Sequence, residues 1–283
     1  MSTIAAFIKR YPVLSYYVLV FAISWGGGIL VLGPSGFMGI GITPRAQLLT
    51  GVPIGILGPA IAGVLLTSII GGRPAMSKLI YQLRKWRVGV GWYAFALLTA
   101  PIIITLSLLV RSTVPTIATT DDKLGLLLIG IGIGLVVSFF EELGWTGFAA
   151  PELRKRFGFL ATGIIMGLLW GLWHFPVFSA SGRASEPLSP IIFTTALLFT
   201  WLIPYRVLMV WLYDHTRSLL LAILMHVPIV ASTFVLAPSE STSTFIVTGN
   251  LSLAIVLWIA VVVIIMSQKR LDAQAGYVGR ALS

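Results

Sequence analysis

Long apolar runs alternate with short polar connections along the whole chain. A helix needs about 20 predominantly apolar residues to cross the hydrocarbon core of a bilayer. The pattern therefore predicts one membrane-spanning helix for each run. We expect about eight spans, at residues 13–32, 49–70, 92–110, 124–150, 159–178, 189–213, 217–236 and 249–267.

The fourth run differs from the others because two adjacent glutamates, Glu141 and Glu142, stand near its end. Pro151 follows them, and we expect it to stop the helix because proline lacks the N–H that a helix interior needs. The connections between runs leave no room for a soluble domain. The sequence thus predicts a single transmembrane domain over residues 1–283, with a core of interest in spans four to seven, residues 124–236.

Composition supports the same class. The chain is 57% hydrophobic and 10% charged, whereas a soluble domain is about 25% charged. We therefore expect an all-α polytopic membrane protein, located in the cell membrane. The absence of cysteine excludes disulfides and thiolate-bound metals. The net charge of +10 is attributed to cytoplasmic loops, and no nucleic-acid partner is expected.

The distribution of Lys and Arg predicts the orientation of these spans. If the N-terminus is cytoplasmic, 14 of the 19 basic residues fall on the cytoplasmic side and four on the other side. The remaining one, Arg206, lies inside the sixth run. Cytoplasmic loops carry an excess of Lys and Arg, so we expect both termini to be cytoplasmic.

Three predicted spans contain residues that hydrocarbon disfavours. Glu141 and Glu142 lie in the fourth, His174 in the fifth and His226 in the seventh. A charged side chain at the centre of a bilayer costs about 3 kcal/mol or more, so such residues usually face the interior of a helix bundle and mark a functional site.

Helical phase indicates which glutamate faces another helix. At 100° per residue, Gly130, Gly134 and Glu141 lie within about 40° of one another, whereas Glu142 lies about 120° from Gly130. Small residues four apart mark a face where another helix packs closely. We therefore expect Glu141 on the packed face and Glu142 to one side of it.

The fifth span repeats this arrangement. Gly163, Gly167 and Gly171 form a stripe of small residues, and Trp170 and His174 lie on or beside it. Two glycine faces that each carry an ionisable residue predict that spans four and five meet there.

Counted along their helices, Glu141, His174 and His226 lie at similar depths, within reach of the cytoplasmic side. A carboxylate can take a proton from water, and an imidazole can orient that water or protonate a leaving amine. A second imidazole can stabilise an oxyanion. The same three side chains are also the ligand types of a zinc site, although the HExxH spacing is absent.

Two other interpretations of these residues stay open. In one, the histidines are helix–helix hydrogen bonds and the glutamates are structural, for example through an ion pair with Arg206 across spans. In the other, Glu141 and His174 relay protons in a transporter. The sequence has no internal repeat of the kind common in transporters, which favours an enzyme.

The motifs around these residues resemble those of the CPBP family of intramembrane endopeptidases, also called Abi or CAAX prenyl protease 2-like. The stretch EELGWTGF, followed by APEL, resembles the family motif EExxxR. Trp170 and His174 match FxxxH in aromatic form, and His226 begins a motif similar to HxxxN. The run YRVLMVWLYDHTRSLLLAILMH also resembles the family, and the resemblance covers about residues 124–236.

The resemblance implies a function and a role for each residue. Glu141 and His174 would activate water, and His226 would stabilise the oxyanion. The chain would be an intramembrane protease of the glutamic type that needs no cofactor, with zinc as the alternative. Its substrate would be a membrane-associated protein or peptide, lipidated in some family members, and membrane lipids would be its surroundings.

Two positions depart from the family pattern. Thr146 stands where the first motif has arginine, so Glu142 needs another partner, for which Arg206 is the candidate. Val230 stands where the third motif has asparagine and cannot donate a hydrogen bond. These departures leave a second functional hypothesis open, in which the chain is a catalytically weak relative that binds a peptide or a partner protein, as in immunity.

The missing asparagine has two candidate substitutes on the same predicted helix. Ser232 and Thr233 follow Pro228, which distorts a helix and so changes where later side chains point. Thr233 shares the His226 face but lies about 10 Å further along the axis, so either hydroxyl is a candidate donor only if the distortion at Pro228 brings it closer.

Overall fold

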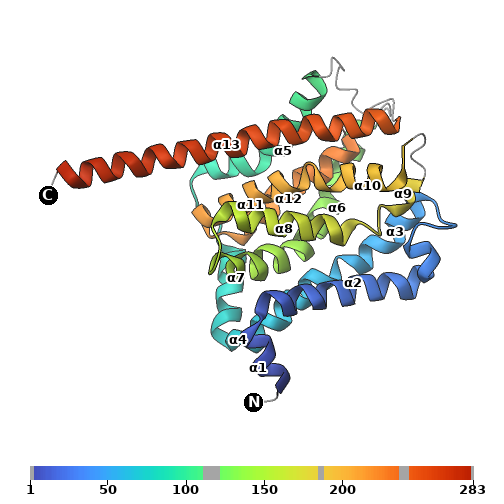
Figure 1. Cartoon of the computed structure of the whole chain (residues 1–283), viewed down its shortest axis with the longest axis horizontal. Helices are drawn as coiled ribbons and strands as arrows, with labels where there is room; N and C mark the ends of the chain where they lie inside the picture. Colours follow the sequence, from blue (N-terminus) through green and yellow to red (C-terminus); the bar gives the residue numbers. More distant parts are fainter. Residues whose placement is uncertain (1–2, 111–121, 184–187, 236–241, 282–283) are drawn as a thin grey trace.

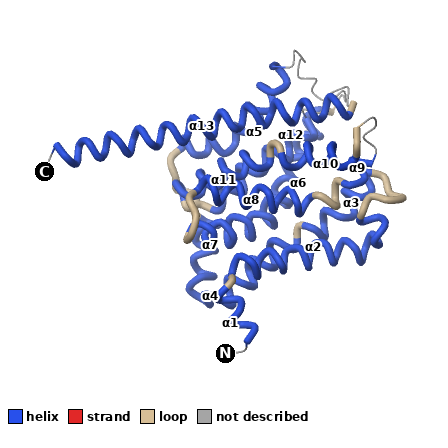
Figure 2. Tube along the Cα trace, in the orientation of Figure 1, coloured by secondary structure: helices blue, strands red, loops and turns tan. Residues whose placement is uncertain are grey.

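The computed structural model describes residues 3–110, 122–183, 188–235 and 242–281, and every regular element within them is helical (Figures 1 and 2). The expected all-α class is confirmed. The elements are α1 (Thr3–Arg10), α2 (Pro12–Phe37), α3 (Pro44–Gly55), α4 (Leu57–Arg84), α5 (Val90–Val110), α6 (Lys123–Gly144), the π-helical turn η1 (Trp145–Ala149), α7 (Ala150–Arg154), α8 (Phe159–His174), α9 (Ser179–Arg183), α10 (Pro190–Phe199), α11 (Leu202–Thr216), α12 (Leu219–Val235) and α13 (Ser243–Ala281).

Each predicted span corresponds to a helical segment. Among the described residues, six segments are long and apolar enough to cross a membrane. Two shorter apolar helices, Phe159–His174 and Leu219–Ser232, occupy the positions of predicted spans five and seven. The protein is therefore a multi-pass membrane protein, and its two shorter helices are the ones that carry His174 and His226. The cytoplasmic location of both termini stays a prediction.

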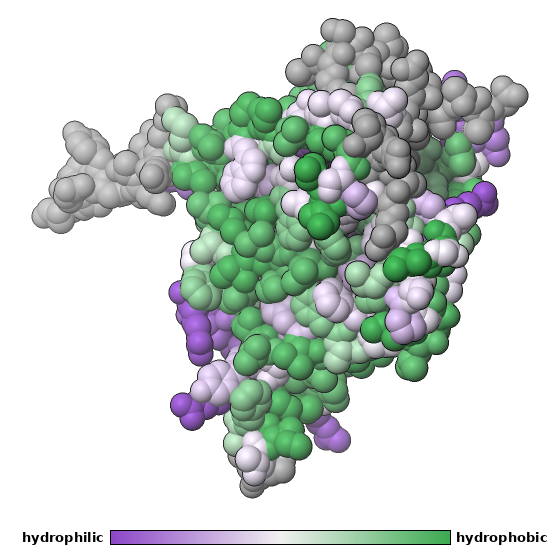
Figure 3. Space-filling model, turned by 45° about the vertical axis from the view of Figure 1, so that its right-hand side comes forward, coloured by the Kyte–Doolittle hydropathy of each residue, from purple (hydrophilic) through white to green (hydrophobic). Residues whose placement is uncertain are grey.

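The outer surface is suited to lipid. Large apolar side chains stay exposed on several long helices, for example Leu30 of α2, Leu128 of α6 and Ile255 of α13. Figure 3 shows hydrophobic side chains over much of one face of the molecule. Because hydrocarbon solvates such side chains, this surface is stable in a bilayer without any further partner.

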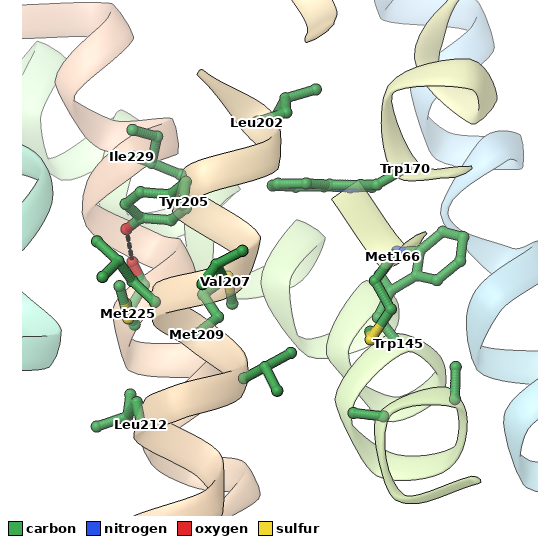
Figure 4. Packing of buried hydrophobic residues seen from close by; sticks show 14 of the residues in the cluster. Trp145, Met166, Trp170, Leu202, Tyr205, Val207, Met209, Leu212, Met225 and Ile229 are labelled. Atoms are coloured by element: carbon green, nitrogen blue, oxygen red, sulfur yellow. Dashed lines mark hydrogen bonds between the residues drawn. The ribbon is translucent and has the colours of Figure 1, made fainter. Parts of the chain in front are cut away.

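Helix α11 is the innermost element, since most of its side chains are buried. Figure 4 shows its large residues, among them Tyr205 and Leu212, packed between α12 and the helix that carries Trp170. The Tyr205 hydroxyl donates to the backbone carbonyl of Met225 in α12 at 2.5 Å. A charged residue on α11 is therefore held at the centre of the bundle, and Arg206 is such a residue.

The glycine face of α6 packs against α12. A Cβ added at Gly130 would meet the Cα of Ala231 at 3.1 Å, and one added at Gly134 would meet the carbonyl oxygen of Val227 at 2.9 Å. The glycines thus permit the close approach that the sequence predicts, but the helix that makes it is α12, which carries His226.

The glycine face of α8 packs against α11. A Cβ at Gly163 would meet the Cα of Val207 at 2.5 Å, and one at Gly167 would meet the Cα of Ile203 at 2.6 Å. The expectation that spans four and five meet through their glycine faces is therefore wrong. A stripe of small residues identifies a closely packed face, but it carries no information about which helix packs there.

The expectation that Pro151 ends the fourth span is also wrong, by three residues. The helical run continues through the π-helical turn η1 into α7 and ends at Arg154. Pro151 lies in the first turn of α7, where its missing N–H is not needed because the preceding turn has a different hydrogen-bond spacing. Single π-helical turns are frequent at functional sites.

Candidate active site

Helix α6 places both glutamates at its last turn, directly before η1. Gly144 follows them and lies against α4, where an added Cβ would collide with the carbonyl oxygen of Pro59. Glu141 is 1% exposed and Glu142 is 0% exposed. Two carboxylates are therefore removed from solvent in one helical turn, and each needs polar partners to offset its lost hydration.

Glu142 is surrounded by donors from three elements. Nη1 of Arg206 in α11 donates to both of its oxygens, at 3.0 and 2.9 Å. Nδ1 of His226 in α12 lies 2.9 Å from Oε1, and the Thr146 hydroxyl in η1 donates to Oε2. The expected pairing of Glu142 with Arg206 is confirmed. This buried carboxylate is thus fixed by an ion pair and two further hydrogen bonds.

Arg206 is itself fully buried and stacked on an aromatic ring. Its guanidinium carbon lies 4.1 Å from the centroid of Trp170 in α8. A cation over the face of a tryptophan is attracted by the ring, most strongly when it is desolvated. Arg206 therefore joins α11 to α6 through Glu142 and to α8 through Trp170.

Glu141 has a different set of neighbours. Trp170 donates its indole N–H to Oε2 at 2.8 Å, and Trp145 donates to the same oxygen at 3.3 Å. Both hydrogen bonds that Glu141 accepts from described side chains thus fall on one oxygen. The carboxylate is held in a fixed orientation by neutral donors, while Oε1 has lone pairs left for a proton.

His174 lies at the end of α8, one turn beyond Trp170. Its Nδ1 lies 2.9 Å from the carbonyl oxygen of Trp170. A carbonyl only accepts, so Nδ1 carries the proton and Nε2 of the neutral ring has a free lone pair. The imidazole packs between Trp170 and Trp173, with ring centroids 5.5 and 4.6 Å away. Trp170 thus contacts Glu141 and His174 at once.

The turn that follows His174 is anchored by the N-terminal helices. Buried Gln47 of α3 donates through Nε2 to the carbonyl oxygen of Pro176 at 2.8 Å and accepts at Oε1 from the N–H of Ala180 at 3.0 Å. Trp25 of α2 donates to the carbonyl oxygen of Trp173 at 3.2 Å. Helices α2 and α3 therefore fix the end of α8 and with it the position of His174.

His226 faces Glu142 with one nitrogen and Trp170 with its ring, at a centroid distance of 5.2 Å. Because an ionised carboxylate only accepts hydrogen bonds, Nδ1 carries a proton. Nε2 can then donate only in the imidazolium form. In that form two positive charges, on Arg206 and His226, contact Glu142.

The substitutes proposed for the missing asparagine are placed only in part. Val230 is partly buried on α12, one turn beyond His226, where it packs against the core. Ser232 is buried, and the side chain of Thr233 lies outside the described residues. The existence of a second oxyanion donor on α12 stays a prediction.

The structure thus brings Glu141, Glu142, His174, Trp170, Thr146, Arg206 and His226 into one connected cluster. Sequence reasoning did not identify Trp145, since a tryptophan in an apolar run is more often a packing residue. The sequence spacing could have predicted a contact between Trp145 and Glu141, however, because Trp145 follows Glu141 by four residues just as Thr146 follows Glu142. Residues four apart are neighbours on a helix.

The zinc alternative needs at least three ligand side chains that converge on one point. Among the described residues, no group of three or more His, Asp and Glu side chains is placed so as to hold a metal ion. Glu142, the carboxylate next to His226, is already paired with the guanidinium of Arg206, which would repel a cation at the same oxygens.

Comparison with known proteins identifies the same part of the chain. Residues 123–232 match the family described as type II CAAX prenyl endopeptidase, Rce1-like. A curated relative, CAAX prenyl protease 2 of Methanococcus maripaludis, is 33% identical over 129 residues. This alignment covers 44% of the chain and 47% of the relative, so the chain spans about half the length of the curated relative it matches.

Proposed function

We propose that the chain is an intramembrane endopeptidase of the glutamic type, because its residues 123–232 match the Rce1-like family of type II CAAX prenyl endopeptidases and its motifs resemble those of that family. It hydrolyses a peptide bond of a membrane-associated protein or peptide, in or near the membrane of the cell. The observation that carries this proposal is the environment of Glu141, a buried carboxylate whose two hydrogen bonds fall on a single oxygen.

In the proposed reaction, Glu141 removes a proton from a water molecule as that water attacks the scissile carbonyl carbon. The indole N–H groups of Trp145 and Trp170 hold Oε2, so Oε1 is the oxygen that takes the proton. Nε2 of His174 accepts a hydrogen bond from the same water and orients it. A positioned base of this kind contributes about 10²–10⁴ to the rate.

His226 stabilises the negative charge that develops on the substrate oxygen. Its imidazolium donates through Nε2, since Nδ1 is directed at Glu142. Glu142 therefore acts as a positioning residue that keeps His226 in the orientation to donate. Preorganised donors of this kind are worth about 10²–10³ in kcat each. Collapse of the intermediate returns the proton held by Glu141 to the leaving amine.

Arg206 takes the place of the arginine that the family motif has at position 146. Both positions adjoin the same carboxylate, since Thr146 donates to Glu142 and Arg206 forms an ion pair with it. In this chain the positive charge comes from α11 instead of η1. This exchange explains how Glu142 stays ionised and buried although the motif arginine is absent.

The substrate class follows from the family description and from the site's position. The matched family is described as a CAAX prenyl endopeptidase and the curated relative is named CAAX prenyl protease 2, so we expect a lipidated protein or peptide substrate. The reaction needs no metal ion, and activity should survive exhaustive chelation. Loss of activity on chelation, with recovery on addition of stoichiometric zinc, would contradict the glutamic mechanism.

The test is cleavage of prenylated and unprenylated peptides by the purified protein in a lipid bilayer, with products identified by mass spectrometry. Glu141→Gln is the informative variant, because the amide oxygen can still accept from both tryptophans but cannot take a proton. Glu152→Gln is the matched control, since Glu152 pairs with Lys155 away from the site. Cleavage by the parent and the control but not by Glu141→Gln is expected. Binding without cleavage by the parent would favour a catalytically inactive, peptide-binding relative.

A further inference from the structure

A cavity with two basic residues in its lining lies outside the candidate active site. Its volume is about 430 Å³, and it is lined by Lys78, Tyr81 and Gln82 of α4, Pro151 of α7, Tyr213 of α11 and Arg217 directly after α11. Figure 1 shows α4 and α7 close together at one end of the bundle. The lining contains two cationic side chains and no acidic one. Such a cavity selects a negatively charged group.

The two cations are available to a ligand. Lys78 is exposed and forms no ion pair with the described residues. Arg217 is 54% exposed, and its closest acid, Asp214, lies 3.6 Å away. The other oxygen of Asp214 is held at 2.6 Å by Arg154, so the charge of Asp214 is shared between two arginines. The cavity therefore keeps a positive potential.

The left-handed backbone conformation of Arg217 is a second, independent observation that points to a function for its side chain. Arg217 has φ of 50°, and it is the only residue other than glycine with positive φ among those described. This left-handed conformation ends α11. Glycine is preferred there, because a side chain adds strain. A residue held in a sparsely populated conformation is a reason to look for a function.

The position of the cavity indicates which anion fills it. Lys78 lies beyond the predicted span 49–70, and Arg217 lies at the start of the predicted span 217–236, so both are at the level of lipid headgroups. Tyr81, 65% exposed, is a residue type enriched at that level. Gln82 of α4 and Tyr213 of α11 both line the cavity between the two cations.

We infer that this cavity binds the phosphodiester headgroup of an anionic phospholipid. Lys78 and Arg217 donate to the phosphate oxygens, and Tyr81 and Pro151 pack against the glycerol and the first methylenes of the acyl chains. Basic pockets between membrane helices on the cytoplasmic side bind headgroups in this way. The site is separate from the chemistry of Glu141, so its occupancy does not depend on the proposed hydrolysis.

The experiment measures binding of phosphatidylglycerol to the full chain in neutral detergent micelles, by native mass spectrometry and by the rise in Tm. Phosphatidylcholine and inorganic phosphate are the comparison ligands. The test variant is the double substitution Lys78→Gln and Arg217→Gly, because glycine removes the side chain while relieving the backbone. Arg84→Gln is the matched control, since Arg84 is exposed at the end of α4 but does not line the cavity.

We expect saturable binding of phosphatidylglycerol by the parent and by Arg84→Gln. The double variant should bind it about thirtyfold more weakly, from the loss of two charges, and should keep its Tm in micelles without added lipid. Equal binding by the parent and the double variant would overturn the site. If Arg84→Gln weakened binding as much as the double variant does, binding would depend on general surface charge and the cavity would not be the site. If inorganic phosphate raised the Tm as much as phosphatidylglycerol does, the ligand would not be a lipid.

Discussion

The two glutamates are neighbours in the chain but lie in opposite kinds of environment. Glu142 faces a guanidinium, an imidazole and a hydroxyl, which use both of its oxygens. Within the described part of the chain, Glu141 accepts hydrogen bonds from two indoles, both on Oε2. The first environment pairs a carboxylate with a buried cation, and the second holds a carboxylate by neutral donors on one oxygen. Identical side chains thus acquire different partners from the helices that pack around them, and this difference is the basis of the separate roles that we propose for them.

The largest effect is expected from removing the cation on the Glu142 side. Arg206→Met leaves a buried carboxylate without its ion-pair partner, which typically costs about 3–5 kcal/mol. We expect a strongly lowered Tm in neutral detergent. Adding Glu142→Gln to Arg206→Met should restore part of the lost stability, because the buried charge is then absent. A double variant less stable than Arg206→Met would show that Glu142 does not depend on Arg206.

A smaller effect, on kcat, is expected from removing one of the two hydrogen bonds that Glu141 accepts. Trp170→Phe keeps an aromatic ring beneath Arg206 but removes the indole donor at 2.8 Å. Hydrogen bonds to charged groups are worth about 1.5–3 kcal/mol, so kcat should fall about tenfold to a hundredfold. The measurement is kcat and KM on any cleaved peptide.

Trp173→Phe is the matched control for this substitution. Trp173 lies in the same aromatic cluster, but its Nε1 has no hydrogen-bond partner among the described residues. We expect kcat of this variant to stay close to that of the parent. Equal losses in both variants would assign the effect to packing and not to the carboxylate.

The smallest expected effect is a gain. Val230→Asn places a donor one turn beyond His226, at the position where the family motif has asparagine. A preorganised oxyanion donor is worth about 10²–10³, but only part of it should return because α12 contains Pro228 and its neighbours are adjusted to valine. We expect kcat to rise up to about tenfold with little change in KM. An unchanged kcat with an intact fold would mean that residue 230 does not face the oxyanion.

The sequence was most informative where hydrocarbon makes a residue type costly. Arg206 and Glu142 could be paired in advance because each is a rare charge in an apolar span. The helical positions followed from run length for the same reason, since water and lipid impose a strong pattern on the chain. In contrast, the glycine stripes of α6 and α8 gave the packed faces but not the partner helices, α12 and α11.

Local backbone geometry was less accessible. The π-helical turn η1 has no signature in the apolar pattern, so the pattern predicts a helix end at Pro151 that the structure does not have. The phase argument predicts Glu141 on the glycine-packed face and Glu142 to one side, and this is wrong. The glycine face packs on α12, the glutamate that contacts α12 through His226 is Glu142, and both carboxylates are buried. Helical phase gives a direction around an axis, whereas burial depends on which helices fill that direction.

We propose that Glu141 is the catalytic base and that Glu142 is a positioning residue. The most direct test of these two roles is to measure Tm and kcat for Glu141→Gln and Glu142→Gln in the same lipid preparation. Our account predicts a crossed result. Glu141→Gln should lose about 10²–10⁴ in kcat and keep its Tm, while Glu142→Gln should lose Tm, because it leaves Arg206 buried without its carboxylate, and lose less of kcat. The account would be contradicted if Glu142→Gln kept its Tm but abolished turnover while Glu141→Gln stayed active.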